Sequence, residues 1–168
     1  MKETLSQKPL EIERKFLVTK IPENLSDFPS SEITQGYLLI TPIAEIRIRN
    51  RSGICTITNK SGKGQSRIEN ERKLTLENFN RLSKKVQGEL IEKTRYLIPY
   101  QNNTIELDIY AGNLKGLIVA EIEFNSEEDA ANFLPPDWLD AEVTNDESFK
   151  NKSLAIKGLP QNPRFFGF

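Results

Sequence analysis

Hydrophobic and polar positions alternate along most of the first 125 residues of this chain, which is typical of β-strands. In residues 44–51, for example, Ile46 and Ile48 alternate with Arg47 and Arg49. Glycine, proline, serine and asparagine interrupt the alternation at intervals, as they do at turns. The pattern predicts eight strands, at residues 10–19, 33–41, 44–51, 53–60, 65–74, 89–99, 103–112 and 116–125.

Three segments carry helical signals instead. Apolar residues repeat at helical spacing after Thr75, which can cap a helix that Gly88 can end. A second helix is expected to begin at Ser126, ahead of three acidic residues, and to stop at Pro135. A third is expected over about 144–156. The chain thus combines a large sheet with a few short helices.

The two faces of the predicted strands differ sharply. One is largely apolar, whereas the other carries charged pairs of the same sign two residues apart, such as Glu11 and Glu13. Side chains one pleat apart lie about 7 Å from each other, and their repulsion is roughly 2 kcal/mol at an effective dielectric of about 20. A solvated sheet face tolerates such a pair, whereas an enclosed face needs counter-ions. We therefore expect an α+β fold dominated by an eight-stranded antiparallel β-barrel, with a charged lumen and with helices packed outside.

Composition narrows the class of protein. A length of 168 residues suits one domain, expected at 10–157 between a lead-in at 1–9 and a tail at 158–168. The 23 basic and 24 acidic residues nearly cancel, which argues against a general binder of nucleic acid or membrane surfaces. Histidine is absent and Cys55 is the only cysteine, so disulfides, zinc fingers and histidine-based triads are excluded. Without an apolar run of about 18 residues or a hydrophobic leader, a cytoplasmic location is expected.

The acidic pairs suggest a metal site. Carboxylate oxygens are the hard ligands that Mg²⁺ and Mn²⁺ accept, together with water and substrate phosphates. A single pair is more often a solvated face, but the chain carries several in its predicted strands. The pairs are Glu11 and Glu13, Glu69 and Glu71, Glu106 and Asp108, and Glu121 and Glu123.

The basic residues of the same face suggest an anion site, because guanidinium groups match phosphate oxygens and several together neutralise a highly charged anion. The alternative is that they only pair with the glutamates across the barrel. Both interpretations place opposite charges in contact, but only the first leaves room between them. These residues are Lys15, Arg47, Arg49, Lys60, Arg67, Lys73, Lys93 and Arg95.

The order of these residues carries a family resemblance. The chain contains Glu11-x-Glu13-x-Lys15, Arg47-x-Arg49, Lys60, Arg67-x-Glu69-x-Glu71, Glu92-Lys93-Thr94-Arg95-Tyr96, Glu106-x-Asp108 and Glu121-x-Glu123. Over about residues 10–157 it resembles the CYTH superfamily, the triphosphate tunnel metalloenzymes, and in particular the stand-alone bacterial triphosphatases. The resemblance implies an eight-stranded antiparallel barrel whose tunnel binds a triphosphate through basic residues and a divalent metal through glutamates.

The resemblance also implies roles for individual residues. Metal binding falls to Glu11, Glu13, Asp108, Glu121 and Glu123. Substrate binding falls to Lys15, Arg47, Arg49, Lys60, Arg67, Lys93, Arg95 and Lys150, with Glu11, Glu13, Lys15 and Lys93 as the catalytic group. Supporting positions are Glu69, Glu71 and Glu106.

The last part of the domain resembles the family's C-terminal helix, which closes or lines one mouth of the tunnel. Many relatives have a tyrosine and a basic residue at the positions of Glu147 to Phe149. This chain departs from that pattern, so ligand contacts from this turn are expected only from Lys150 or Lys152.

We expect hydrolysis of a small-molecule triphosphate, most simply inorganic tripolyphosphate, through in-line attack by a water molecule that Mg²⁺ or Mn²⁺ activates. Three alternatives remain open: a class IV-type adenylate cyclase, which makes cyclic AMP and pyrophosphate from ATP, a thiamine triphosphatase, and a polyphosphate-binding module without catalysis. No nucleic-acid or membrane partner is expected, and a homodimer remains open.

Overall fold

The computed structural model describes residues 11–63 and 66–161, and its core is a single antiparallel sheet of eight strands. The strand order across the sheet is β1-β8-β7-β6-β2-β3-β4-β5. The predicted lead-in at 1–9 and the tail beyond residue 161 lie outside the described residues. The strands are β1 (Ile12–Leu17), β2 (Ser30–Ile40), β3 (Ala44–Arg51), β4 (Ile54–Lys63), β5 (Ser66–Leu74), β6 (Gln87–Tyr100), β7 (Asn103–Tyr110) and β8 (Ile118–Phe124).

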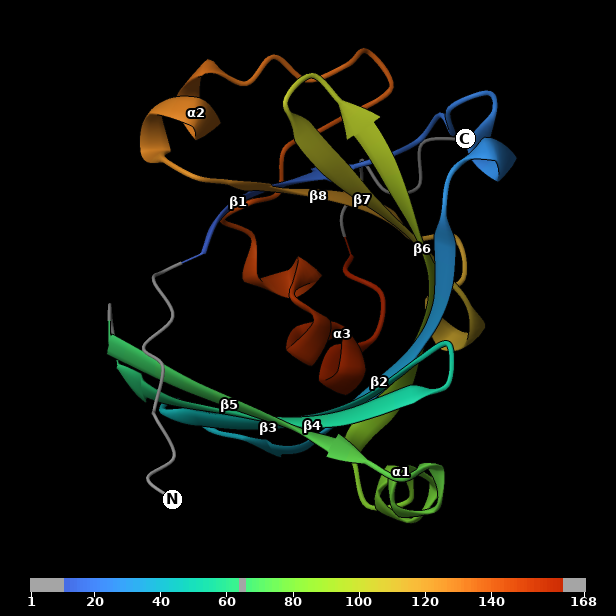
Figure 1. The fold of residues 1–168 in the computed structure, drawn as a ribbon, viewed down its shortest axis with the longest axis vertical. Helices are drawn as coiled ribbons and strands as arrows, with labels where there is room; N and C mark the ends of the chain where they lie inside the picture. Colours follow the sequence, from blue (N-terminus) through green and yellow to red (C-terminus); the bar gives the residue numbers. More distant parts are fainter. Residues whose placement is uncertain (1–10, 64–65, 162–168) are drawn as a thin grey trace.

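The sheet curls around an interior, but hydrogen bonds do not close it into the predicted barrel (Figure 1). Within the described chain, no ladder joins the two end strands, β1 and β5. The outer edge of β1 is already paired with a later segment: Leu17 N donates to Ala141 O at 2.9 Å, and Val143 N donates to Lys15 O at 2.8 Å. This segment thus occupies the part of the β1 edge at Lys15 and Leu17, and the described sheet is open between β1 and β5.

The pattern of alternation places charge inside and apolar side chains outside, as predicted. In the register of β1 and β8, Lys15 lies opposite Glu121 on the inner face, and Phe16 lies opposite Ala120 on the outer face. Helix α2 (Glu127–Asn132) packs over β1 and β8 on that outer face. There Phe133 contacts Phe16 and Phe124, with ring centroids 6.5 and 5.3 Å away.

Helix α1 (Leu76–Ser83) packs on the outer face of β3 and β4, where Phe79 joins buried Ile48. Thr75 caps it as predicted, since its hydroxyl accepts from Asn78 N. The predicted end at Gly88 is wrong, because α1 stops at Ser83 and Gly88 lies in β6. Gly88 has a φ of +68°, and a Cβ there would lie 2.1 Å from the Ala155 carbonyl oxygen, so no other residue fits.

Helix α3 (Asn151–Lys157) differs from the prediction that the helices pack outside. It begins later than expected, after a 3₁₀ turn at Glu147–Phe149, and it packs against the inner faces of β6 and β2. Figure 1 shows it between the two halves of the curled sheet. The inner face is apolar at this end, so α3 closes it by burying Phe149 and Leu154 against Leu17, Tyr37, Ile91, Leu117 and Val119.

Two further 3₁₀ turns connect strands, at Leu25–Asp27 and at Gly112–Leu114. In the part of the chain that the structure describes, no helix has the length and apolar character needed to cross a membrane. Among the described residues, the curled sheet and the start of α3 enclose a charged chamber.

Candidate active site

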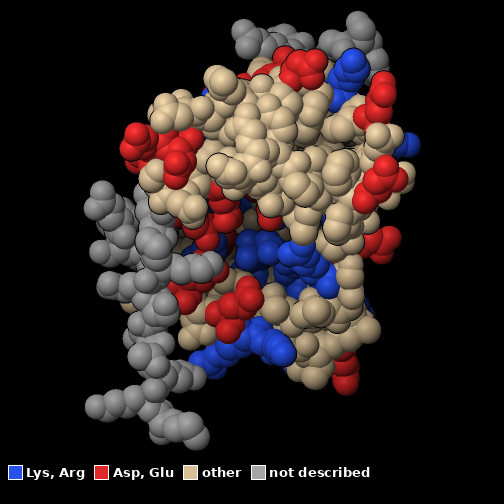
Figure 2. Space-filling model, turned by 45° about the horizontal axis from the view of Figure 1, so that its top comes forward, with Lys and Arg blue, Asp and Glu red and all other residues tan. Residues whose placement is uncertain are grey.

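The chamber is a cavity of about 470 Å³, and almost every described residue that lines it is charged. Figure 2 shows basic and acidic side chains gathered in a hollow of the surface. The lining holds eight carboxylates, Glu11, Glu13, Glu45, Glu69, Glu71, Glu106, Glu121 and Glu123. It also holds eight cations, Lys15, Arg47, Arg49, Arg51, Lys60, Arg95, Lys150 and Lys152, with Tyr37 and Asn151 as the remaining residues.

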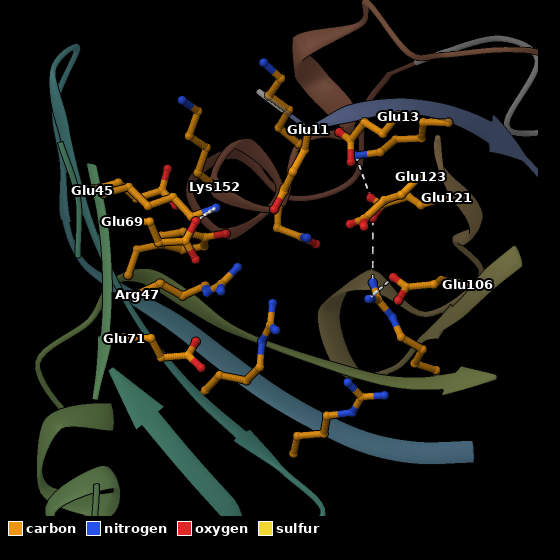
Figure 3. Close-up of a pocket in the computed structure, with 18 residues that line it drawn as sticks. Glu11, Glu13, Glu45, Arg47, Glu69, Glu71, Glu106, Glu121, Glu123 and Lys152 are labelled. Atoms are coloured by element: carbon orange, nitrogen blue, oxygen red, sulfur yellow. Dashed lines mark hydrogen bonds and ion pairs between the residues drawn. The ribbon is translucent and has the colours of Figure 1, made fainter. Parts of the chain in front are cut away.

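One side of the cavity, which we call the acidic wall, is formed by Glu11, Glu13, Glu121 and Glu123 from the ends of β1 and β8 (Figure 3). Glu13 lies directly opposite Glu123 in the strand register. Burial raises the pKa of Glu13, and the neighbouring charges of Glu121, Glu11 and Glu123 raise it further against the opposing effect of Lys15. Glu13 thus lies among carboxylates whose charges repel its own.

Two cations hold the inner part of this wall in place. Lys15 Nζ lies 2.8 Å from Glu121 Oε1, and Arg95 Nη2 lies 3.7 Å from Glu121 Oε2. Arg95 also donates to Glu106 across the β6–β7 ladder. Although burial alone would raise the pKa of Glu121, the charges of Lys15 and Lys93 lower it, so this carboxylate is ionised.

Beneath the wall lies a buried ion cluster of Lys93, Arg95 and Asp108. Lys93 Nζ donates to Asp108 Oδ2 at 2.5 Å, and Arg95 grips the same carboxylate through Nε and Nη2, each at 2.7 Å. The side chains of Lys93 and Asp108 are both 0% exposed, and neither lines the cavity. Burial would raise the pKa of Asp108, but Lys93 and Arg95 together lower it.

The opposite side, which we call the basic wall, is formed by Arg47, Arg49 and Arg51 of β3 with Lys60 of β4. Lys60 pairs with Glu69 at 3.4 Å. Among the described residues, no carboxylate lies within ion-pair distance of the three arginines, and Arg47 Nε is buried without a hydrogen-bond partner. Burial lowers the pKa of Arg49 to about 10, and the charges of Arg47 and Arg95 contribute. The basic wall therefore needs an anion.

The third side comes from the first turn of α3, which brings Lys150, Asn151 and Lys152 to the cavity. The Tyr110 hydroxyl donates to Asn151 Oδ1 at 2.8 Å and ties this turn to β7. Lys150 Nζ lies 2.5 Å from Glu147 Oε1 in an exposed pair. In the turn that precedes α3, Phe149 is buried in the apolar end of the interior.

Most of the predicted site residues line the cavity, but two do not. Lys93 and Asp108 lie in the buried ion cluster, and the side chain of Arg67 lies outside the described part. The predicted site did not include Glu45, Arg51, Tyr37 and Asn151, although Glu45 and Arg51 share the parity of Arg47 and Arg49 and could have been included. Lys152, which was expected as a possible ligand contact, also lines the cavity. Those brought together are Glu11, Glu13, Lys15, Arg47, Arg49, Lys60, Glu69, Glu71, Arg95, Glu106, Glu121, Glu123 and Lys150.

Comparison with known proteins shows the family to which the chain belongs. The chain is 40% identical over 148 residues to an inorganic triphosphatase of Nitrosomonas europaea, and the match covers 87% of this chain and 97% of the relative. The chain belongs to the CYTH superfamily of triphosphate tunnel metalloenzymes. An inorganic triphosphatase of Acetivibrio thermocellus is 32% identical over 148 residues, with coverage of 86% and 92%.

Solved structures agree with this assignment. A structure of an inorganic triphosphatase superimposes with a TM-score of 0.73 at 37% identity, covering 90% of this chain and 97% of the other. A Bacillus halodurans protein proposed to be an adenylate cyclase has a TM-score of 0.54 at 23% identity, with coverage of 94% and 98%, which shows the shared fold alone. No family model matches the chain.

The donor set of the acidic wall fits the divalent metal that membership of this superfamily suggests. Its four glutamates supply hard oxygen ligands on two neighbouring strands, and the raised pKa of Glu13 marks a place where a cation would relieve repulsion. In the described residues, no three acidic side chains already stand close enough to hold an ion. Asp108 does not fit the set, because Lys93 and Arg95 already occupy both of its oxygens.

Proposed function

We propose that this protein hydrolyses inorganic tripolyphosphate to orthophosphate and pyrophosphate with a divalent metal ion. The observation that carries the proposal is the division of one cavity into a basic wall and an acidic wall. Among the described residues, no carboxylate lies within ion-pair distance of the three arginines of the basic wall, and in the acidic wall the charges around Glu13 repel its own. A polyanion and a divalent cation together would neutralise both walls. The curated relatives named above act on the same class of substrate.

The basic wall would hold the phosphate groups. Arg47 and Arg49 are the strongest candidates, since no carboxylate competes for their guanidinium groups within the described chain. Lys150 and Lys152 would contact the chain of phosphates from the α3 side. Because charge spreads over the terminal oxygens as the anhydride bond loosens, cations fixed in place lower the barrier most at that stage.

The acidic wall would hold the metal through Glu11, Glu13, Glu121 and Glu123, with Mg²⁺ or Mn²⁺ as the ion. When bound, such an ion supplies Lewis acidity toward phosphate oxygens and toward water. Lys15 keeps Glu121 ionised and fixed in position, while Arg95 holds Glu106 in position through an ion pair.

The reaction balances with water alone. A water oxygen bonds to a terminal phosphorus, the bond from that phosphorus to the bridging oxygen breaks, and the bridging oxygen leaves on pyrophosphate. The proton that water loses passes to solvent or to a carboxylate of the cavity, since the chain contains no histidine.

The lining argues against a nucleotide substrate. Among the described residues of the cavity, the one aromatic side chain is Tyr37, which is only 3% exposed. A nucleobase or a thiazolium ring would therefore meet charged groups in place of a stacking surface.

The decisive assay offers purified protein and Mg²⁺ with tripolyphosphate, ATP or thiamine triphosphate in separate reactions, and scores orthophosphate, pyrophosphate and cyclic AMP. We expect equimolar orthophosphate and pyrophosphate from tripolyphosphate, and far slower turnover of the other two. Cyclic AMP from ATP would establish a cyclase instead, and tight binding of tripolyphosphate without release of phosphate would establish a binding module.

A further inference from the structure

The three arginines of β3 differ in what holds them. Arg49 Nε donates to Gln35 Oε1 at 3.3 Å, and Arg51 Nε donates to Ser31 Oγ at 3.0 Å. Arg47 Nε, by contrast, has no hydrogen-bond partner among the described residues. Two of the three guanidinium groups are therefore held from β2, and both are held by neutral oxygens.

Gln35 is the more enclosed of these two acceptors. It lies directly opposite Arg49 in the β2–β3 register and is 0% exposed. Its amide nitrogen donates to the Tyr37 hydroxyl at 3.4 Å, so both ends of the amide are used. Because a guanidinium carries donors only, the amide must present its oxygen to Arg49, and its nitrogen then faces Tyr37.

A neutral acceptor affects Arg49 differently from a carboxylate. Elsewhere in the cavity, Lys60 and Arg95 are paired with Glu69 and Glu106, which cancel part of their charge. Gln35 occupies the Nε hydrogen and fixes the plane of the guanidinium, but it leaves the positive charge intact. The remaining N–H groups of Arg49 are then presented to an incoming phosphate in a fixed orientation.

We propose that Gln35 is a positioning residue, which orients Arg49 toward the phosphates without neutralising it and so sets the affinity of the cavity for its polyanion. The inference rests on the proposed triphosphatase function. In this proposal Gln35 affects substrate affinity through its hydrogen bond with Arg49, and it does not contact the substrate itself.

Two substitutions separate orientation from charge. Gln35→Met keeps the length and most of the volume but removes the acceptor, and we expect KM for tripolyphosphate to rise about tenfold with kcat little changed, as for one lost hydrogen bond to a charged group. Gln35→Glu keeps an acceptor but pairs with Arg49, so we expect a larger rise in KM. The matched control is Gln87→Met, since Gln87 is exposed at the start of β6 and outside the cavity lining.

A double-mutant cycle with Arg49→Ala gives the sharpest test. If Gln35 acts through Arg49, Gln35→Met changes KM in the wild-type background and has no further effect once Arg49 is removed. An unchanged KM for folded Gln35→Met, or an equal rise with and without Arg49, would overturn the proposal.

Failure of the proposed function is distinguishable from failure of this inference. If the wild type releases no phosphate, the triphosphatase assignment fails, and the same cycle is then run on tripolyphosphate affinity measured by titration calorimetry. If the wild type is active and both Gln35 variants match it, the positioning role alone is wrong.

Discussion

The buried ion cluster and the charged cavity contain the same kinds of residue, but their charges are paired to different extents. In the cluster, Asp108 receives three hydrogen bonds from Lys93 and Arg95, and water is excluded. In the neighbouring cavity, Arg47 Nε has no hydrogen-bond partner among the described residues, and Glu13 lies among other carboxylates. The chain thus completes its own ion pairs in one region and leaves them incomplete in the next.

This difference separates structural from functional charge. A buried pair whose every atom is satisfied contributes little by itself, but the loss of one partner is severe because the other charge stays buried. Charges that lack partners in the folded protein do not stabilise it, and they gain energy only when a ligand supplies the missing ions. The comparison therefore predicts large stability effects in the cluster and large binding effects in the cavity.

The largest effect is expected for Asp108→Asn. The substitution leaves Lys93 and Arg95 without their shared carboxylate, and we expect a loss of about 3–5 kcal/mol in the free energy of unfolding. Urea unfolding followed by circular dichroism measures it. The control is Glu106→Gln, whose side chain is 28% exposed and should cost much less. Equal stability of Asp108→Asn and the wild type would show that the cluster is not structural.

The same cluster gives a pH dependence. Because Lys93 and Arg95 lower the pKa of Asp108 below its unfolded value, its contribution to stability is complete above about pH 4 and is lost as the pH falls through the lower folded value. The stability of the wild type should therefore decline at acidic pH, and that of Asp108→Asn should decline less.

The next effect is on binding. Arg47→Ala removes a guanidinium that has no carboxylate partner among the described residues, so we expect tripolyphosphate affinity to fall by at least about 1.5 kcal/mol while stability stays the same or rises. Titration calorimetry gives the first quantity and thermal unfolding the second. The matched control is Arg81→Ala on the outer helix α1, where Arg81 contacts Asn78 and should not affect the ligand. Unchanged affinity for Arg47→Ala would remove this residue from the anion site.

Much of the charged face follows from sequence alone, because a period of two is a local property that needs no knowledge of tertiary structure. The inward direction of Glu13, Arg47 and Glu121 required only their parity. The burial of Lys93 and Asp108 could not be derived in the same way. Their parity is the same as that of the charged residues that line the cavity, and only the neighbouring strands decide which inward-facing charges are buried. The absence of hydrogen-bonded closure in the described sheet could not be derived either, because the pairing of the β1 edge with a segment about 125 residues later is a long-range contact.

A smaller effect on stability is expected for Glu13→Gln. Because the pKa of Glu13 is raised in the folded protein, the folded protein binds a proton at this carboxyl more tightly than the unfolded chain does. The resulting contribution to stability is present at acidic pH and is lost as the pH rises through the raised pKa. At neutral pH the ionised carboxylate is therefore a cost, and Glu13→Gln should slightly raise the melting temperature without metal. Added Mg²⁺ should stabilise the wild type more than the variant, and metal-dependent turnover should be abolished. If Mg²⁺ stabilises both proteins equally, Glu13 is not a ligand.

The smallest effect is expected for Glu147→Gln. The pair that Glu147 makes with Lys150 is exposed, and such pairs contribute almost nothing to stability. The melting temperature should stay constant, while KM for tripolyphosphate should fall slightly because Lys150 is released to the cavity. A rise in KM would show that Lys150 must be held by Glu147 to serve the substrate.

The central claim is that the arginines of the cavity bind a polyanion. Its most direct test is a calorimetric titration of tripolyphosphate into metal-free protein, which separates binding from turnover. The account predicts saturable binding that weakens with salt, strengthens when Mg²⁺ is added, and is lost in the Arg47→Ala, Arg49→Ala double variant. Equal binding by the wild type and the double variant, or no binding by either, would contradict it.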